Sequence, residues 1–123
     1  MKIKAVSGFT CHVKSLNKTV KFYEALGFEN RKQDANHATL YSNWFWIDCL
    51  AIGKDERTES AKGADLGAGI SIYMSVDNVD EFHAHLLAKG LKPKTKPQDQ
   101  PWGNREFTLR DPDGYNVVIF KRK

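Results

Sequence analysis

The sequence is short of the features that mark secreted, membrane-spanning and disulfide-rich proteins. Its 123 residues include only two cysteines, Cys11 and Cys49, both in strand-like sequence. Such cysteines more often pack as small buried hydrophobic residues than form a bridge. No apolar run is long enough to cross a bilayer, and no apolar segment with a small-residue cleavage site opens the chain. We therefore expect a cytoplasmic protein with no membrane partner.

The basic residues lack the pattern that is typical of nucleic-acid binding. The net charge is +4 and the pI is near 9.1, but the positive residues are scattered. The exceptions are the alternating Lys92, Lys94 and Lys96 and the terminal run 121–123. Alternating lysines are typical of a solvated face that protects a sheet edge, whereas nucleic-acid binding normally needs a denser stripe. We expect no nucleic-acid partner.

Two segments have the pattern of amphipathic helices. The first starts near Asn17, which can cap it, and ends at Gly27, where a helix C-cap glycine belongs. The second starts at Asn78, with Glu81 three residues later, and ends at Gly90. In both, apolar residues recur at helical spacing. The two segments therefore look like copies of one unit.

A strand-like run precedes each helix, and three follow it. In the first half the runs are 3–13, 28–33, 37–41 and 44–51; in the second they are 70–76, 92–96, 105–110 and 115–121. This order predicts an α+β fold, a single domain over 1–123 with two βαβββ modules at about 1–55 and 68–123. A polar connector at about 53–67 is expected to be a mobile loop. We expect each helix to cover one face of a curved mixed sheet, with the other faces lining a cleft.

Three motifs in this order resemble those of the vicinal oxygen chelate superfamily, which includes glyoxalase I, extradiol dioxygenases and bleomycin-resistance proteins. Residues 16–28 (LNKTVKFYEALGF) are similar to its first-helix motif, and residues 76–82 (VDNVDEF) to its second. Residues 102–107 (WGNREF), followed by the turn 111–114 (DPDG), are closest to the bleomycin-resistance branch. The resemblance covers nearly the whole chain and implies two βαβββ modules and a homodimer. Unpaired strand edges in so small a chain also favour a dimer.

The resemblance implies where a metal would be bound, and the residues there are not ligands. The superfamily's enzymes typically carry two histidines and a glutamate at the positions that fall on Gly8, Ser71 and Val118. None of these three residues is a metal ligand. His83 and His85 diverge on a helix, and His37 is expected to be exposed. The sequence therefore predicts no metal and no other cofactor.

Aromatic residues are the best candidates for ligand contacts, because they offer flat surfaces for stacking. Trp102 lies in a Pro/Gly loop, and family likeness favours it most. Trp44 and Trp46 share one strand face with Asp48, and the pattern leaves open whether that face meets the helices or the cleft. Arg105 and Glu106 match the motif but could equally form a structural ion pair. The predicted ligand-binding residues are Trp102, Tyr73, Trp46, Trp44, His12, Arg105 and Glu106.

The pattern favours non-catalytic binding of a small, drug-like, aromatic or cationic molecule, as in bleomycin-resistance proteins. No catalytic constellation stands out, since Glu106 and Asp48 have no assignable partner. The basic net charge is unlike that of acidic proteins that capture cationic antibiotics, so an aromatic or anionic ligand is as plausible as bleomycin. Two alternatives stay open: a metal-dependent glyoxalase- or dioxygenase-like enzyme with displaced ligands, and a structural or regulatory dimer with a filled cleft.

Overall fold

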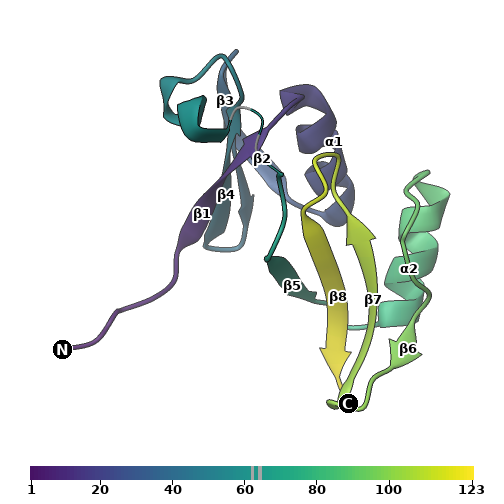
Figure 1. The fold of residues 1–123 in the computed structure, drawn as a ribbon. Helices are drawn as coiled ribbons and strands as arrows, with labels where there is room; N and C mark the ends of the chain where they lie inside the picture. The colour runs from purple at the N-terminus through teal and green to yellow at the C-terminus, as the bar shows by residue number, and fades with distance from the viewer. Residues whose placement is uncertain (62, 64) are drawn as a thin grey trace. The chain divides into compact units, whose positions relative to one another are not determined.

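The computed structural model describes residues 1–61, 63 and 65–123. The chain divides into two compact units, Met1–Leu66 and Gly67–Lys123. Each unit holds one four-stranded sheet and one α-helix (Figure 1). Within the described part of the chain, no helix is long and apolar enough to span a membrane.

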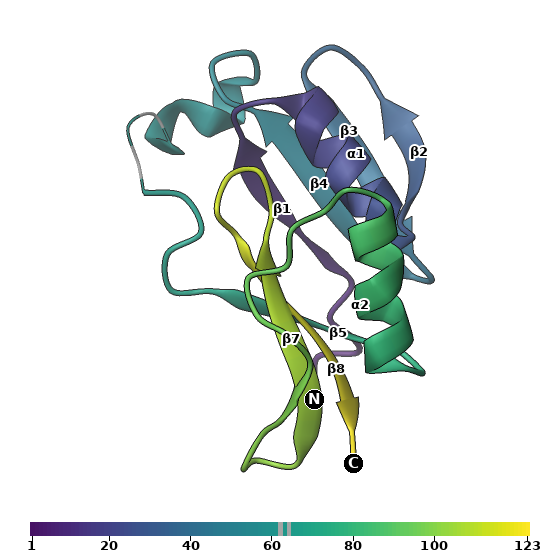
Figure 2. The same cartoon turned by 90° about the vertical axis from the view of Figure 1, so that its right-hand side faces the viewer.

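The first unit contains a mixed sheet in the order β1-β4-β3-β2. Its strands are β1 (Gly8–Val13), β2 (Glu29–Gln33), β3 (His37–Ser42) and β4 (Phe45–Ala51), and helix α1 (Leu16–Leu26) follows β1. Strand β1 runs parallel to β4, and the other neighbours are antiparallel. Helix α1 lies along one face of this sheet (Figure 2).

The second unit repeats the topology, with the order β5-β8-β7-β6. Its strands are β5 (Ser71–Ser75), β6 (Gln98–Asp99), β7 (Asn104–Arg110) and β8 (Asn116–Arg122), and helix α2 (Val79–Ala88) follows β5. Strand β5 is parallel to β8, and β8 is antiparallel to β7. The predicted α+β fold with a repeated βαβββ order is confirmed.

Helix caps explain where both helices begin. Asn78 caps α2 as predicted, since its side chain accepts a hydrogen bond from the Glu81 N–H at 3.0 Å. Helix α1 is capped by Ser15, not by Asn17, and the Ser15 hydroxyl accepts from the Lys18 N–H at 3.3 Å. Gly27 closes α1 in the left-handed region, with φ of 106°, as its sequence position predicts.

Three of the elements predicted from the sequence differ in the structure. Strand β1 begins at Gly8, since the ladder with β4 starts there, and residues 1–7 are exposed. Residues 92–96 form no strand; Pro93 and Pro97 lack the N–H groups that a ladder needs, and the short β6 follows them. The connector, expected to be a loop, contains the 3₁₀-helix η1 (Glu56–Ala61); Lys62 and Ala64 of that segment lie outside the described residues.

The core of each unit lies between its sheet and its helix. In the first unit Val20 and Tyr23 of α1 are buried, as are alternate residues of the strands: Cys11, Val13, Ala38, Leu40, Ile47 and Cys49. In the second unit the buried residues include Val79, Leu86, Phe107, Leu109, Val117 and Ile119. Both cysteines are thus buried, as expected. Because strand side chains alternate, each sheet has a second face turned away from its helix, which we call the distal face.

Candidate functional site: the distal faces of the two sheets

Burial decides which side of β4 meets the helix. Ile47 and Cys49 have no exposed surface, whereas Trp46 and Asp48 are half-buried. Trp46 and Asp48 therefore belong to the distal face of the first sheet, which answers the question that the sequence left open. The register adds neighbours from β1 and β3 to this face: Gly8, Thr10, His12, His37, Thr39 and Tyr41.

Gly8 and Trp46 are direct neighbours on the distal face of the first sheet. A Cβ atom at position 8 would fall on the Trp46 indole and on the Trp46 carbonyl oxygen. The indole thus occupies the space that any side chain of residue 8 would need. As long as residue 46 is a tryptophan in this position, residue 8 must therefore be a glycine to avoid overlap.

Asp48 stands at the centre of a polar cluster on the same face. The Thr39 hydroxyl donates a hydrogen bond to the Asp48 carboxylate at 3.1 Å, and His37 Nε2 lies 4.0 Å from the same oxygen. His37 Nδ1 lies 3.0 Å from Asp34. Backbone N–H groups of Asn36 and His37 hold the pKa of Asp34 below its usual value. The cluster offers a carboxylate acceptor beside an aromatic surface.

His37 departs from its expected position. Only 18% of its side chain is exposed, because the ring lies between the carboxylates of Asp34 and Asp48. Tyr41, four residues along β3 on the same face, carries the Arg31 guanidinium over its ring at 4.3 Å. The alternation of residues 37–41 indicates this shared face, but not the carboxylates that flank it.

The distal face of the second sheet is also aromatic and polar. Tyr73 of β5 packs edge-on against Phe120 of β8, with ring centroids 5.6 Å apart, and it remains exposed. Beside this pair, the Asn116 amide donates to the Ser71 hydroxyl at 2.9 Å. Val118 lies directly opposite Tyr73 in the ladder and is buried.

Arg105 and Glu106 point to opposite faces of β7. Glu106 lies opposite Phe120, and it is 5% exposed and accepts from the Asn104 amide at 3.4 Å. Arg105 lies on the α2 side, where its guanidinium binds Asp80 at 2.8 Å and 2.9 Å and Asp99 at 3.1 Å. These two carboxylates raise the pKa of Arg105. Arg105 is thus in an ion pair, but its partners are not Glu106.

Trp44 and Trp102 both lie in turns and are largely exposed. Trp44 follows Asn43, whose φ of 55° is left-handed, in the tight turn between β3 and β4. Trp102 lies in the turn between β6 and β7, where the Gly103 N–H donates to the Gln100 carbonyl at 3.1 Å. Neither tryptophan packs as core, so both indoles are available for contact.

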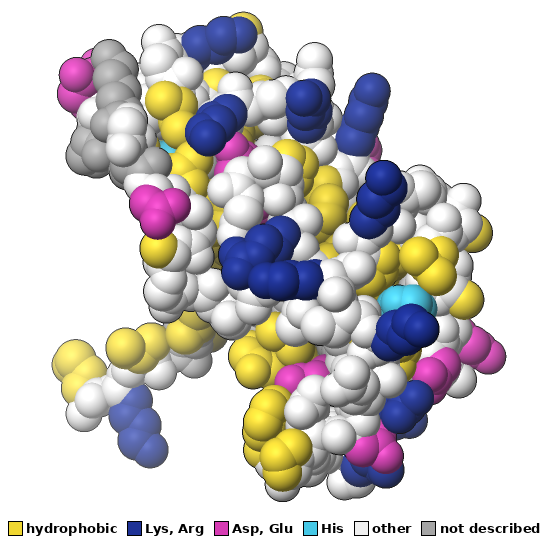
Figure 3. All heavy atoms as spheres, turned by 45° about the vertical axis from the view of Figure 1, so that its right-hand side comes forward, with side chains coloured by type: hydrophobic (Ala, Val, Ile, Leu, Met, Phe, Trp, Pro, Cys, Tyr) yellow, Lys and Arg dark blue, Asp and Glu magenta, His cyan; other side chains and the backbone are white. Residues whose placement is uncertain are grey.

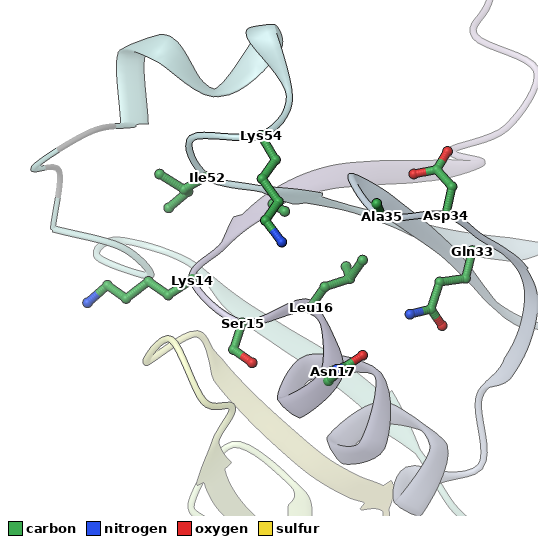
Figure 4. Close-up of a pocket in the computed structure, with 10 residues that line it drawn as sticks. Lys14, Ser15, Leu16, Asn17, Gln33, Asp34, Ala35, Ile52 and Lys54 are labelled. Atoms are coloured by element: carbon green, nitrogen blue, oxygen red, sulfur yellow. The ribbon is translucent and has the colours of Figure 1, made fainter.

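A hollow in the first unit lies away from its distal face. A cavity of about 410 Å³ is bordered by the start of α1, the β2–β3 turn and the end of β4 (Figure 4). Lys54 and Leu16 point into it, while Lys14 extends away (Figure 4). A second hollow of about 400 Å³, at the start of α2, is bordered by Arg105, Asp80 and the C-terminal basic residues. Any ligand contact of Arg105 would be made there and not on the distal face.

The residues at the positions where the resemblance would place a metal do not fit one. Gly8 has no side chain, and the indole fills its place; the Ser71 hydroxyl is bound by Asn116, and Val118 is apolar. Among residues 1–61, 63 and 65–123, no group of three or more His, Cys, Asp or Glu is placed to hold a metal ion. The side chains present instead offer stacking surfaces and hydrogen-bond acceptors.

Comparison with known proteins assigns the chain to a family. The model of the glyoxalase/bleomycin resistance protein/dioxygenase superfamily matches residues 8–119. The chain belongs to this superfamily. A bleomycin resistance protein of Geobacillus stearothermophilus is 27% identical over 120 residues, which cover 89% of this chain and 91% of that protein. The resemblance to the superfamily is confirmed.

Solved structures of other proteins share the fold. A bleomycin-binding protein complexed with bleomycin gives a TM-score of 0.72 at 22% identity, covering 98% of this chain and all of that one (100%). A lactoylglutathione lyase from Agrobacterium tumefaciens gives a TM-score of 0.75 at 16% identity, covering 98% and 95% of the two chains. One fold thus holds both a binding protein and a lyase, so the function of this chain must be argued from its own side chains.

The predicted ligand-binding residues fall into three groups. His12 and Trp46 share the distal face of the first sheet, and Tyr73 and Glu106 share that of the second. Trp44 and Trp102 lie in turns, and Arg105 lies on the helix side. Ligand contacts by any of them remain predictions. Residues that the sequence did not single out for ligand contact, but that lie on the same faces, are Thr39, Asn104 and Phe120.

Proposed function

We propose that the protein binds and sequesters a small, partly aromatic molecule without transforming it, as a protein of the bleomycin-resistance type. One observation carries the proposal: the Trp46 indole fills the place of a side chain at position 8. A stacking surface would therefore stand where the resemblance implies a metal ligand in the family's enzymes. The identity with bleomycin resistance proteins supports the same function.

The ligand we propose is planar and carries a hydrogen-bond donor or a positive charge. Trp46 offers a flat surface, and Asp48, whose side chain is 18% exposed, lies two residues along the same strand face. A partly buried carboxylate interacts with a cation more strongly than a solvated one, because the local dielectric constant is lower. Bleomycin belongs to this chemical class and is the first ligand to test.

The alternative of a metal-dependent glyoxalase- or dioxygenase-like enzyme finds no support in these residues. Such chemistry needs a Lewis acid held by imidazole or carboxylate groups. Gly8, Ser71 and Val118 provide neither group, and packing of the indole opposes a larger residue at position 8. Binding is therefore the function that the side chains favour.

Calorimetric and tryptophan-fluorescence titrations with bleomycin and a panel of planar cationic drugs test the proposal. We expect saturable binding that leaves the ligand chemically intact. Trp46→Ala and Asp48→Asn should each weaken it about tenfold, which corresponds to roughly 1.4 kcal/mol. Leu87→Ala is the matched control, because it truncates an exposed apolar side chain of α2. Absence of binding across the panel, or equal weakening by Leu87→Ala, would refute the proposal.

We also propose that the protein works as a homodimer in the cytoplasm. Strands β1 and β5 form sheet edges, and exposed edges favour pairing with another chain. Exposed Trp44 and Trp102 would add apolar area to such a contact. Light scattering coupled to size exclusion measures the mass directly, and a mass of 14.0 kDa, that of one chain, would exclude the dimer.

A further inference from the structure

Cys11 and Cys49 form a buried pair that the proposed function does not use. They are the only cysteines of the chain, and they lie directly opposite each other in the parallel ladder of β1 and β4. Their Sγ atoms are 3.7 Å apart. Cys11 is 5% exposed and Cys49 is fully buried, on the side of the sheet that meets α1.

The spacing of the two strands permits a bond between these thiols. Neighbouring strands lie about 4.8 Å apart, which falls within the Cα separation of about 4.4–6.8 Å that disulfides span. The two sulfur atoms would have to approach from 3.7 Å to about 2.05 Å. Because the backbones are fixed by the ladder on either side, such a bond would be strained, and strained disulfides are reduced more easily.

We propose that Cys11 and Cys49 are an oxidative modification site, at which a peroxide converts the two thiols into a reversible intrachain disulfide. The thiolate of one cysteine attacks the peroxide, the O–O bond breaks, and a sulfenic acid and hydroxide form. The second thiol then attacks the sulfenic sulfur, forming the S–S bond and releasing water. Two thiols and one hydrogen peroxide thus give one disulfide and two waters.

The difference in exposure between the two cysteines sets the order of these steps. Cys11 retains some exposed surface, whereas Cys49 has none, so a small oxidant reaches Cys11 first. The sulfenic acid forms within contact distance of the Cys49 sulfur. The second step is therefore faster than the first, and sulfenic acid does not accumulate in the wild-type chain.

Peroxide treatment of the 123-residue chain tests the site, with intact mass measured under denaturing, non-reducing conditions. We expect a loss of about 2 Da, a fall in titratable thiols from two to none, and full reversal by dithiothreitol. Peptide mapping should place the bond between Cys11 and Cys49. The protein should remain one chain on a non-reducing gel.

Two single variants serve as controls and as a second readout. Cys49→Ala and Cys11→Ala each keep one thiol, so neither can lose 2 Da, and dimedone should trap sulfenic acid in them but not in the wild type. The remaining thiol of Cys49→Ala should react several-fold faster than that of Cys11→Ala. Three results would each overturn the proposal: oxygen adducts without a disulfide in the wild type, bonds only between chains, or two intact thiols after prolonged exposure.

Discussion

Replacing Gly8 with alanine should destabilise the first unit, because position 8 has no room for a side chain. A Cβ atom there would overlap the Trp46 indole and carbonyl oxygen, well inside the 3.4–4 Å of ordinary contact. Gly8 is not among the glycines with positive φ, so backbone strain does not contribute. The cost therefore comes from overlap alone, partly with the indole and partly with the carbonyl oxygen.

The size of the effect follows from the kind of atoms that are overlapped. Overpacking a tight site costs about 1–3 kcal/mol. We expect about 2 kcal/mol, because one overlapped atom is a main-chain oxygen that moves only with its strand. Unfolding entropy is about 2.1 cal/mol/K per residue, so 1 kcal/mol shifts the melting temperature of a 123-residue chain by roughly 4 °C. Gly8→Ala should therefore melt about 8 °C below the wild type.

Thermal and urea unfolding, followed by circular dichroism and tryptophan fluorescence, measure this cost. Thr10→Ala is the matched control, because Thr10 is exposed on the same strand and face, and it should change stability by less than about 0.5 kcal/mol. The double variant Gly8→Ala/Trp46→Ala completes a cycle whose interaction energy is the share due to the indole. The remainder is due to the carbonyl oxygen.

Two results would refute the packing argument. One is a melting temperature for Gly8→Ala within about 2 °C of the wild type. The other is a double-variant cycle with no interaction energy, which would mean that the indole does not limit position 8. In the first case a larger residue could be accepted at position 8, and the metal-dependent alternative would regain support.

Three further predictions concern local structure. Asn78→Ala should cost about 1 kcal/mol in urea unfolding, because it removes the cap on the Glu81 N–H, whereas Asn78→Asp should cost much less. Asp111→Ala should cost about 1–3 kcal/mol, because the buried side chain accepts from two backbone N–H groups of the turn; Asp111→Asn, which keeps an acceptor, should cost less. The pKa values of Asp34 and Asp80 are lowered, so their contribution to stability is complete above about pH 4 and is lost as pH falls through the lower folded-state pKa. Melting curves from pH 7 to pH 2 should show that fall, and Asp80→Asn should make it smaller; a fall that begins near pH 6 would contradict the assignment.

The fold could be predicted because its determinants are local. Apolar spacing marks both helices, and Asn78 and Gly27 act at the helix ends as their positions suggest. The turn at Asp111–Gly114 likewise forms where its proline and glycine predict one, and the Gly114 N–H donates a hydrogen bond to the Asp111 carbonyl at 3.0 Å. Where two good caps stand two residues apart, as Ser15 and Asn17 do, the pattern alone could not choose between them.

The candidate site could be predicted only in part, because its contacts depend on register between distant segments. Nothing local in the sequence shows that Trp46 lies beside Gly8 or that Cys49 lies beside Cys11, 38 residues away. The partner of Arg105 on α2, Asp80, is 25 residues away and was not foreseen. Strand alternation does place residues on a common face, so the sequence groups Trp46 with Asp48, as the structure has them, but it does not show which residues of other strands lie beside them.

Net charge is a poor guide to the ligand of this protein. Lysine and arginine side chains are spread over the surface among uncharged groups (Figure 3), and exposed charges are screened within about 8 Å at physiological salt. The acidic groups of the distal faces differ in kind: Asp48 is 18% exposed and Glu106 is 5% exposed, so solvent screens them less. A charge of +4 would therefore slow the encounter with a cationic ligand at low salt, whereas in the proposed function its affinity would depend on the Asp48 carboxylate near Trp46. The basic composition is thus compatible with capture of a cationic aromatic molecule.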